Sequence, residues 1–162
     1  MSLRIGHGFD VHRFAEGRPL ILGGVQFDHP RGLSGHSDAD VVTHALCDAL
    51  LGGAGLGDLG SHFPDTDPAY KDIDSQALLA EVVKRVRVAG WRAVNADLTV
   101  VCEEPKIAPR REEMASVLRR GFPDPVAIHV KATTSEGLGF PGRREGIAAF
   151  AVALLEAVDS TD

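Results

Sequence analysis

Asp10, Val11 and His12 place an acid and an imidazole two residues apart near the start of the chain. Residues i and i+2 of a β-strand project from the same face, so Asp10 and His12 would lie side by side. A carboxylate and an imidazole placed in this way are two of the ligands that Zn²⁺ takes in proteins. His44 and Asp48 lie at i and i+4 of a predicted helix, which would supply a third ligand. The pattern predicts a metal site with one open coordination position; the alternative is a hydrogen-bonded polar pair at a strand end.

A second polar cluster, residues 131–137, carries three hydroxyls and the carboxylate of Glu136 after a predicted strand. Hydroxyls and free backbone amides at a strand end donate well to phosphate. Glu136 would hold Mg²⁺ beside them, whereas the alternative for the segment is an ordinary turn held by its Ser and Thr side chains. Residues 55–60 match G-x-G-x-x-G but follow a predicted helix, so they do not predict a dinucleotide site.

Alternating residues predict a strand over residues 3–11. Its odd positions are mostly apolar and include His7, which we interpret as a core histidine. Its even positions hold the metal-site candidates and two glycines that leave space above that face. A glycine pair at 23–24, between two short apolar runs, predicts a hairpin.

Helical spacing of apolar residues predicts a helix that carries His44, capped by Ser37 or Asp38 and ended by the glycine pair at 52–53. Residues 54–70 are rich in Gly, Pro and Asp and predict a long loop, which in a compact domain is usually functional. The remaining elements are a helix capped by Ser75, a helix starting near residue 109, strands over 98–102 and 126–133, and a last segment that fits either helix or strand. If that segment is a strand, its all-alanine face would let another layer approach closely.

Composition limits the classes of function. The chain has 162 residues, 44% of them hydrophobic, which suits one compact α/β (α+β) domain over residues 1–162. A formal charge of −6 argues against a nucleic-acid coat but allows a small phosphorylated ligand. The longest apolar run, residues 147–155, is shorter than the roughly 20 residues that a membrane span needs. Two cysteines make no disulfide framework, which predicts a reducing, cytoplasmic location.

Five motifs, in order along nearly the whole chain, resemble the methylerythritol cyclodiphosphate synthase family. They are Gly6-His7-Gly8-Phe9-Asp10-Val11-His12, Gly35-His36-Ser37-Asp38-Ala39-Asp40 with His44 and Asp48 after it, Leu56-Gly57-Asp58-Leu59-Gly60 with Phe63-Pro64-Asp65-Thr66-Asp67, Glu104-Pro105-Lys106-Ile107, and Thr133-Thr134-Ser135-Glu136-Gly137-Leu138-Gly139-Phe140.

The resemblance implies a set of ligands and roles. Asp10, His12 and His44 would bind a divalent metal, usually Zn²⁺, and Glu136 would hold Mg²⁺ or Mn²⁺ on the substrate diphosphate. Catalytic roles would fall to His36 and Thr134, which would polarise phosphoryl oxygens or stabilise the transition state. The implied substrate-binding residues are Ser37, Asp58, Leu59, Gly60, Phe63, Pro64, Asp65, Thr66, Asp67, Lys106, Thr133, Ser135, Glu136, Phe140 and Arg143, the last two also lining a trimer axis.

The resemblance also implies an activity and an assembly. The family converts 4-diphosphocytidyl-2-C-methyl-D-erythritol 2-phosphate into a cyclic diphosphate and releases CMP, in the non-mevalonate route to isoprenoid precursors. It forms homotrimers of mixed α/β subunits with sheets packed around a threefold axis and active sites between neighbours. The neighbour would supply Lys106, Thr133 and Thr134. Two rival classes stay open: a phosphohydrolase that activates water at the same metal, and a non-catalytic trimer that senses a nucleotide or isoprenoid ligand.

Overall fold

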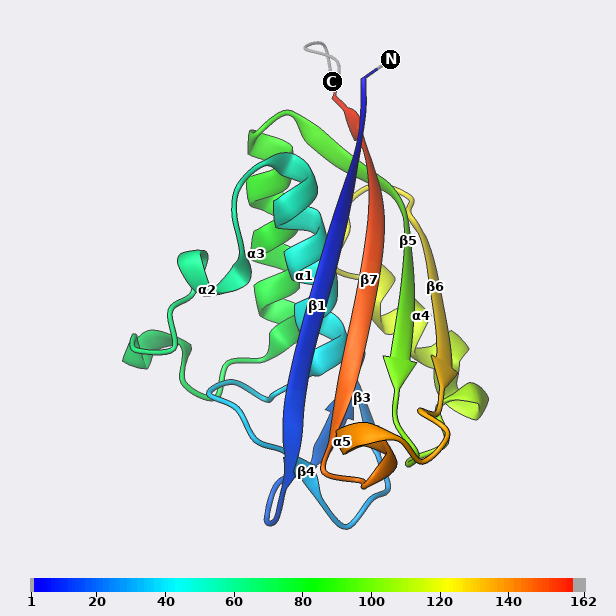
Figure 1. The fold of residues 1–162 in the computed structure, drawn as a ribbon. Helices are drawn as coiled ribbons and strands as arrows, with labels where there is room; N and C mark the ends of the chain where they lie inside the picture. Colours follow the sequence, from blue (N-terminus) through cyan, green and yellow to red (C-terminus); the bar gives the residue numbers. More distant parts are fainter. Residues whose placement is uncertain (1, 159–162) are drawn as a thin grey trace.

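A five-stranded mixed sheet forms the framework of the computed structural model, which describes residues 2–158 (Figure 1). The strand order is β4-β1-β7-β5-β6, antiparallel except for the parallel pair β5 and β6, and β2 and β3 form a separate hairpin. The elements in chain order are β1 (Leu3–Ala15), β2 (Leu20–Leu22), β3 (Val25–Phe27), β4 (Gly32–Leu33), α1 (Val41–Ala54), α2 (Leu59–His62), η1 (Pro68–Tyr70), α3 (Ser75–Val88), β5 (Trp91–Val101), η2 (Ala108–Arg110), α4 (Arg111–Arg119), β6 (Ala127–Thr133), α5 (Gly139–Gly142) and β7 (Gly146–Ala157).

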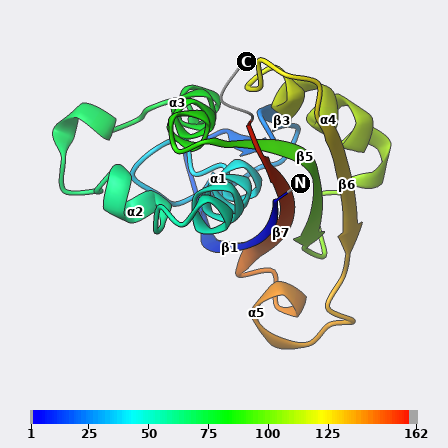
Figure 2. The same ribbon diagram turned by 90° about the horizontal axis from the view of Figure 1, so that it is seen from above.

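The long helices cover one face of this sheet. Helix α1 packs on β1 and β7, α3 packs on α1, and α4 packs along β6 (Figure 2). The outer face of β1 and β7 instead leaves apolar side chains in solvent, with Ile5 73% and Val152 45% exposed. The predicted fold class, an α/β domain with a mixed sheet and helices on one face, is therefore confirmed. No helix within residues 2–158 has the length and apolarity to cross a membrane.

The last segment is a strand, which settles the choice between helix and strand. Ala149, Ala151 and Ala153 are fully buried on the face of β7 that meets α1. Phe150 and Val152 alternate with them and point outward. The alanine face of β7 lets another layer pack closely against it, as predicted, and within the chain that layer is helix α1.

Strand β1 follows the same arrangement, and this makes the interpretation of His7 wrong. Gly6 and Gly8 are buried under α1, whereas His7 on the opposite face is exposed. A side chain added at Gly8 would reach within 1.9 Å of the Ala45 carbonyl oxygen. The glycines thus leave space that the helix backbone fills, and the more apolar face of the strand is the outer one.

The N-terminal cap of α1 is Asp40, not Ser37 or Asp38, and the helix runs past 52–53 to a left-handed Gly55. The Asp40 carboxylate is fully buried and accepts hydrogen bonds from Gly23 N (2.8 Å) and Gly24 N (2.7 Å) as well as Thr43 N (3.0 Å). One carboxylate therefore ties the predicted β2–β3 hairpin to the start of the helix that carries His44. Burial raises the pKa of Asp40.

The predicted loop over residues 54–70 contains two short helical turns, α2 and η1. Asp58 caps α2 and Asp67 caps η1, each by accepting a backbone N–H. Asp74, one residue before the predicted cap Ser75, caps α3. The Asp-rich composition of this region thus largely reflects helix starts, as expected of short carboxylates.

Candidate metal centre and its cleft

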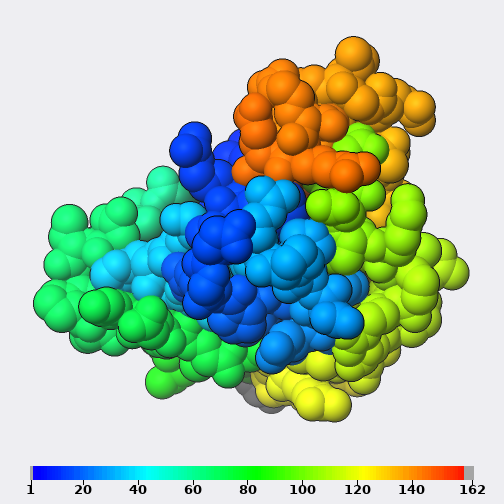
Figure 3. Space-filling model, turned by 90° about the horizontal axis from the view of Figure 1, so that it is seen from below, coloured from blue at the N-terminus to red at the C-terminus, as the bar shows by residue number. Residues whose placement is uncertain are grey.

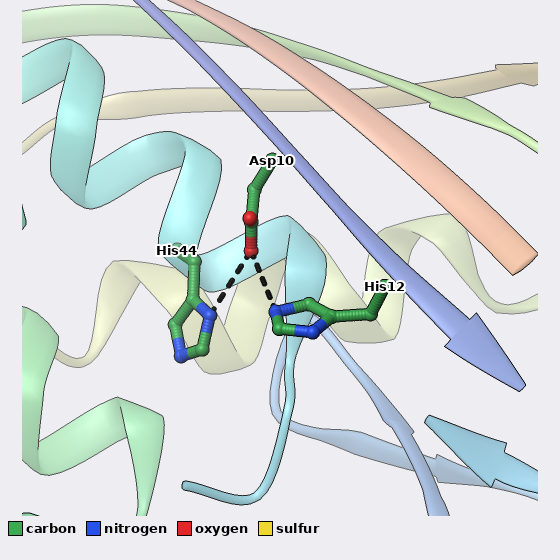
Figure 4. Close-up of side chains that lie close together, drawn as sticks. All are labelled: Asp10, His12 and His44. Carbon is green, nitrogen blue, oxygen red and sulfur yellow. Dashed lines mark hydrogen bonds and ion pairs between the residues drawn. The ribbon is translucent and has the colours of Figure 1, made fainter. Parts of the chain in front are cut away.

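Asp10, His12 and His44 meet where β1 passes the first turn of α1 (Figure 4). Asp10 Oδ2 lies 3.0 Å from His12 Nε2 and 3.1 Å from His44 Nδ1. One ligand atom from each residue falls within 4.8 Å of the others. The predicted spacing on the strand and the predicted helical third ligand are therefore brought together. Asp48, the other candidate third ligand, is not in this group and instead accepts a hydrogen bond from Leu59 N at 2.7 Å.

The orientation of His12 tests whether the group fits a cation. Its Nδ1 lies 2.6 Å from the Ser34 carbonyl oxygen, which accepts and never donates, so Nδ1 carries the proton. Its Nε2 is buried and makes no hydrogen bond within the described part of the chain, although Asp10 Oδ2 is near. A lone pair on Nε2 and a carboxylate oxygen thus face one another across a small gap. A metal ion bound between them would satisfy both atoms.

Electrostatics favour a cation at this point. Burial alone would raise the pKa of Asp10, but His12 and His44 lower it to about 2, so the carboxylate is ionised at neutral pH. Burial lowers the pKa of His12, and the carboxylate of Asp10 outweighs that effect and raises it. One carboxylate and two imidazoles are a ligand set typical of zinc, and three protein ligands leave one position for a substrate oxygen.

The triad opens into a cleft of about 610 Å³. This volume falls within the range of small-molecule sites, roughly 300–1,000 Å³. The predicted site residues that line it are His36, Ser37, Asp58, Leu59, Gly60, Phe63, Pro64 and Asp65. Asp48, the other candidate metal ligand, also lines the cleft, and the lining residues that the sequence did not single out as binding are Gly35, Tyr70, Ile73 and Leu78. Thr66 and Asp67 follow Asp65 in the same loop but do not line the cleft, and their roles stay predictions.

In the cleft loop, residues 55–74 between α1 and α3, some side-chain atoms are hydrogen-bonded within the loop and others are not. Asp58 Oδ1 accepts from both Ser61 N (2.7 Å) and Ser61 Oγ (2.5 Å). Within residues 2–158, Oδ2 of Asp58 has no such donor, so it is placed to accept from a ligand hydroxyl. His36 Nε2 lies 3.4 Å from the Asp67 carbonyl oxygen, and Phe63 packs edge-on against Tyr70 with ring centroids 5.2 Å apart. These contacts hold a polar loop next to the metal centre.

The other predicted residues lie elsewhere in the chain. Strands β7 and β5 separate β1 from β6, and the second cluster follows β5 and β6 at the far edge of the sheet. Its members are Lys106, Thr133, Thr134, Ser135, Glu136, Phe140 and Arg143, none of which lines the cleft. Figure 3 shows the α5 segment (orange) and the loop around residue 65 (green) protruding on different sides of the molecule. The chain therefore presents two separate polar clusters.

Glu103 organises the second cluster, and sequence reasoning missed it. Its Oε1 accepts from Ser135 N (3.1 Å), Ser135 Oγ (3.3 Å) and Gly137 N (3.4 Å). Between them, Glu136 has a left-handed backbone with φ of 55°. Thr134 Oγ1 accepts a hydrogen bond from Glu136 N at 3.2 Å. The segment therefore also forms the turn held by Ser and Thr side chains that was the alternative prediction. A turn held in this way still leaves the Glu136 side chain exposed for a ligand.

Comparison with known proteins decides the family. The model of the YgbB family matches residues 3–156. The chain belongs to the YgbB family. Two relatives are the 2-C-methyl-D-erythritol 2,4-cyclodiphosphate synthases of Syntrophobacter fumaroxidans and Salinibacter ruber. The first is 58% identical, over 94% of this chain and 97% of its own length. The second is 59% identical, over 95% and 99%.

Solved structures agree with this membership of the YgbB family. A 2C-methyl-D-erythritol-2,4-cyclodiphosphate synthase in its CDP-bound form has a TM-score of 0.84 and 40% identity, covering 94% of this chain and 100% of that one. The Plasmodium falciparum IspF in complex with CDP has a TM-score of 0.83 and 29% identity, over 98% of both chains. The bifunctional IspDF of Campylobacter jejuni has a TM-score of 0.93 and 43% identity over 99% of this chain, which spans only 44% of that longer protein.

Proposed function

We propose that this chain is an enzyme that converts 4-diphosphocytidyl-2-C-methyl-D-erythritol 2-phosphate into 2-C-methyl-D-erythritol 2,4-cyclodiphosphate and releases CMP. Its reaction class is that of a phosphorus–oxygen lyase in the non-mevalonate route, and one synthase domain spans residues 1–162. The observation that carries the proposal is the Asp10, His12 and His44 triad at the cleft, with its unpaired His12 Nε2, in a chain so similar to synthases of that name.

The chemistry of the substrate fits the residues that the cleft offers. An oxygen of the 2-phosphate attacks the β-phosphorus of the diphosphate, a new P–O bond closes the ring, and the bond from that phosphorus to the bridging oxygen of CMP breaks. The attacking phosphate is already ionised at neutral pH, so no general base is required. Cations held by the triad and by Glu136 supply charge neutralisation and alignment for the phosphoryl groups when bound.

The residues of the chain itself provide orientation. Asp58, with one oxygen engaged by Ser61, accepts from the polyol hydroxyls, and Ser37 and His36 contact the phosphate beside them. His36 on this side and Thr134 on the other polarise phosphoryl oxygens as charge moves to the leaving group. Fixing the attacking oxygen near the phosphorus replaces a bimolecular encounter, an effect equivalent to about 10⁵–10⁸ M.

We further propose that the chain acts as a homotrimer with shared active sites. Phe9 and Phe150 pair across β1 and β7 with ring centroids 5.0 Å apart, yet are 44% and 39% exposed, among a wider apolar face that includes Ile5 and Val152. An exposed apolar face of this kind marks an interaction surface. Packing this face around a threefold axis buries it and brings the second cluster of one subunit, with Lys106 and Thr133, to the metal cleft of the next.

The cytoplasm is the proposed location. Cys47 and Cys102 are both free and buried. Burial raises the pKa of Cys47 well above its usual value and that of Cys102 to about 11, so neither thiol is reactive. Free thiols suit a reducing compartment.

Incubation with the cytidyl substrate, followed by phosphorus NMR, tests the activity. We expect CMP and a product in which both phosphates stay on the polyol as a ring. A product that has gained water would point to the phosphohydrolase, and binding without turnover would point to the non-catalytic trimer; either would refute cyclisation.

Mixing two inactive variants, His44→Ala and Lys106→Ala, tests the shared site. After gentle denaturation and refolding, some clefts would pair an intact metal half with an intact cytidine half, and part of the activity should return. Mass spectrometry confirms that mixed trimers formed. Mixed trimers without recovered turnover would show that both residues serve one subunit's own site.

A further inference from the structure

The second ring nitrogen of His44 points away from the metal centre into a buried polar cluster. His44 Nε2 lies 2.9 Å from Ser75 Oγ and 3.1 Å from Ser37 Oγ. Ser75 is the first residue of α3 and is fully buried. Its hydroxyl donates a short hydrogen bond to Asp38 Oδ1, and its backbone N donates to Asp38 Oδ2 at 2.9 Å. Ser75 therefore sits between the carboxylate of Asp38 and the imidazole of His44.

The direction of each hydrogen bond in this chain of groups follows from the donors available. An ionised carboxylate only accepts, so the single hydroxyl proton of Ser75 is directed at Asp38. Ser75 Oγ then has only lone pairs to offer His44, so this contact requires Nε2 to donate, and Ser37 Oγ can accept from the same N–H. The other nitrogen, Nδ1, is left with its lone pair, and it is Nδ1 that lies 3.1 Å from Asp10 Oδ2.

We infer that Ser75, held by Asp38, is a positioning residue that fixes the tautomer and ring orientation of His44 for metal binding. The inference rests on the proposed metal site. Outer partners of this kind orient metal-ligating histidines and raise their basicity, and losing one weakens metal affinity by about 10–100-fold. His12 has an equivalent partner in the Ser34 carbonyl oxygen. Of the two, only the partner of His44 is a side chain that a substitution can remove.

The same link joins the metal centre to the far end of the cleft loop. Asp38 N donates to the Ile73 carbonyl oxygen at 3.3 Å, and Asp72 N donates to the His36 carbonyl oxygen at 2.9 Å. The segment that carries His36 is thus paired with the segment that leads into Ser75. The orientation of His44 and the position of the segment that leads into Ser75 therefore depend on the same contacts.

Ser75→Ala tests the inference, with Asp74→Ala as the matched control. Asp74 caps α3 by accepting from Gln76 N at 2.8 Å and is exposed, so its replacement by Ala weakens the same helix start without touching His44. The zinc dissociation constant is measured by competition with a chromogenic chelator, and the thermal stability of each metal-free protein is measured alongside. We expect zinc binding at least tenfold weaker in Ser75→Ala and within twofold of the original in Asp74→Ala, at similar melting temperatures.

Zinc affinity in Ser75→Ala equal to that of the control would overturn the inference, since the hydroxyl would then serve only the helix start. Should Ser75→Ala fail to fold, Asp38→Asn keeps the hydroxyl and loosens its hold, and an unchanged zinc affinity there would overturn the inference equally. Metal affinity is measured without substrate. A chain that binds zinc but releases no CMP would therefore refute cyclisation and leave the role of Ser75 standing.

Discussion

Strand β1 and helix α1 meet backbone to backbone at Gly8, and this contact sets the distance between two metal-ligating residues. A Cβ added at Gly8 would lie 1.9 Å from the Ala45 carbonyl oxygen and 2.7 Å from Ala49 N. Both obstacles are helix backbone, so no change of rotamer relieves them. Restoring an ordinary contact of 3.4 Å requires α1 to move away by about 1.5 Å.

Gly8→Ala should therefore damage stability and the metal centre together. Forced overpacking typically costs about 1–3 kcal/mol, and a clash with backbone belongs at the upper end. For a chain of this size, about 3 kcal/mol lowers the melting temperature on the order of 6–12 °C. His44 belongs to α1 and Asp10 belongs to β1. The 3.1 Å distance between His44 Nδ1 and Asp10 Oδ2 therefore increases when the helix moves away from the strand. We expect zinc affinity to fall by at least about tenfold, the effect of a misplaced ligand.

Gly52→Ala is the matched control, because it adds the same methyl group at a glycine of α1 near β1 where the new Cβ meets no clash. Its nearest neighbour would be the His7 carbonyl oxygen at 3.9 Å, and the position is exposed. Helix propensity predicts unchanged or higher stability, by up to about 1 kcal/mol. Thermal unfolding and chelator competition are measured on both variants. A Gly8→Ala protein with the original melting temperature and zinc affinity would refute the idea that this close contact places His44.

Three further predictions concern the second cluster and pH. Glu136→Gln should lower activity, with partial recovery in excess Mg²⁺ and normal zinc content by elemental analysis; loss of zinc would mean that the two metal sites are assigned the wrong way round. Glu103→Ala removes the acceptor of Ser135 and Gly137, so the substrate KM should rise while zinc affinity stays the same; an unchanged KM would contradict its positioning role. In chelator-treated protein, the raised pKa of His12 adds stability below about pH 6.5 that is lost as the pH rises through that pKa. The Asp10 pKa of about 2 adds stability above about pH 3.8 that is lost as the pH falls toward 2. Melting temperatures should therefore decline from pH 6 to pH 8, and a rise over that interval would contradict the assignment.

The Asp10 and His12 pair of the metal triad was predictable because its geometry is local. A spacing of two residues on a strand places the side chains of Asp10 and His12 on the same face of the sheet. The burial of that face was not predictable in the same way. Apolar alternation pointed the odd residues of β1 inward, but glycine packs closest to a helix, so the glycine face is inside and His7 is exposed. Hydrophobicity alone misassigns a strand whose apolar face is exposed and whose glycine face packs against a helix.

The partners of His44 were not visible in the sequence, because they come from distant segments. Asp38 and Ser75 are 37 residues apart in the sequence. Each is of a residue type that is common at a helix N-cap, so the sequence analysis predicted that they are caps. In the structure the caps are Asp40 and Asp74, which leaves Ser75 free to contact His44 and Asp38 free to accept from Ser75. A helix that starts one or two residues away from the predicted position thus changes the role of these residues from helix cap to contact near the metal centre.

The placement of the two clusters connects assembly with catalysis. The triad lies at β1 and the cluster around Glu136 follows β6, and strands β7 and β5 lie between β1 and β6 in the sheet. No bend of a packed sheet brings the two clusters together within one chain, because strand pairing fixes their separation. Under the proposed function, a substrate that uses both clusters at once would therefore be held by two copies of the chain. The exposed apolar face of β1 and β7 lies between the clusters, where such copies would pack. In the proposed trimer, the exposed apolar side chains of this face, Phe150 among them, would be buried between copies next to the shared active site.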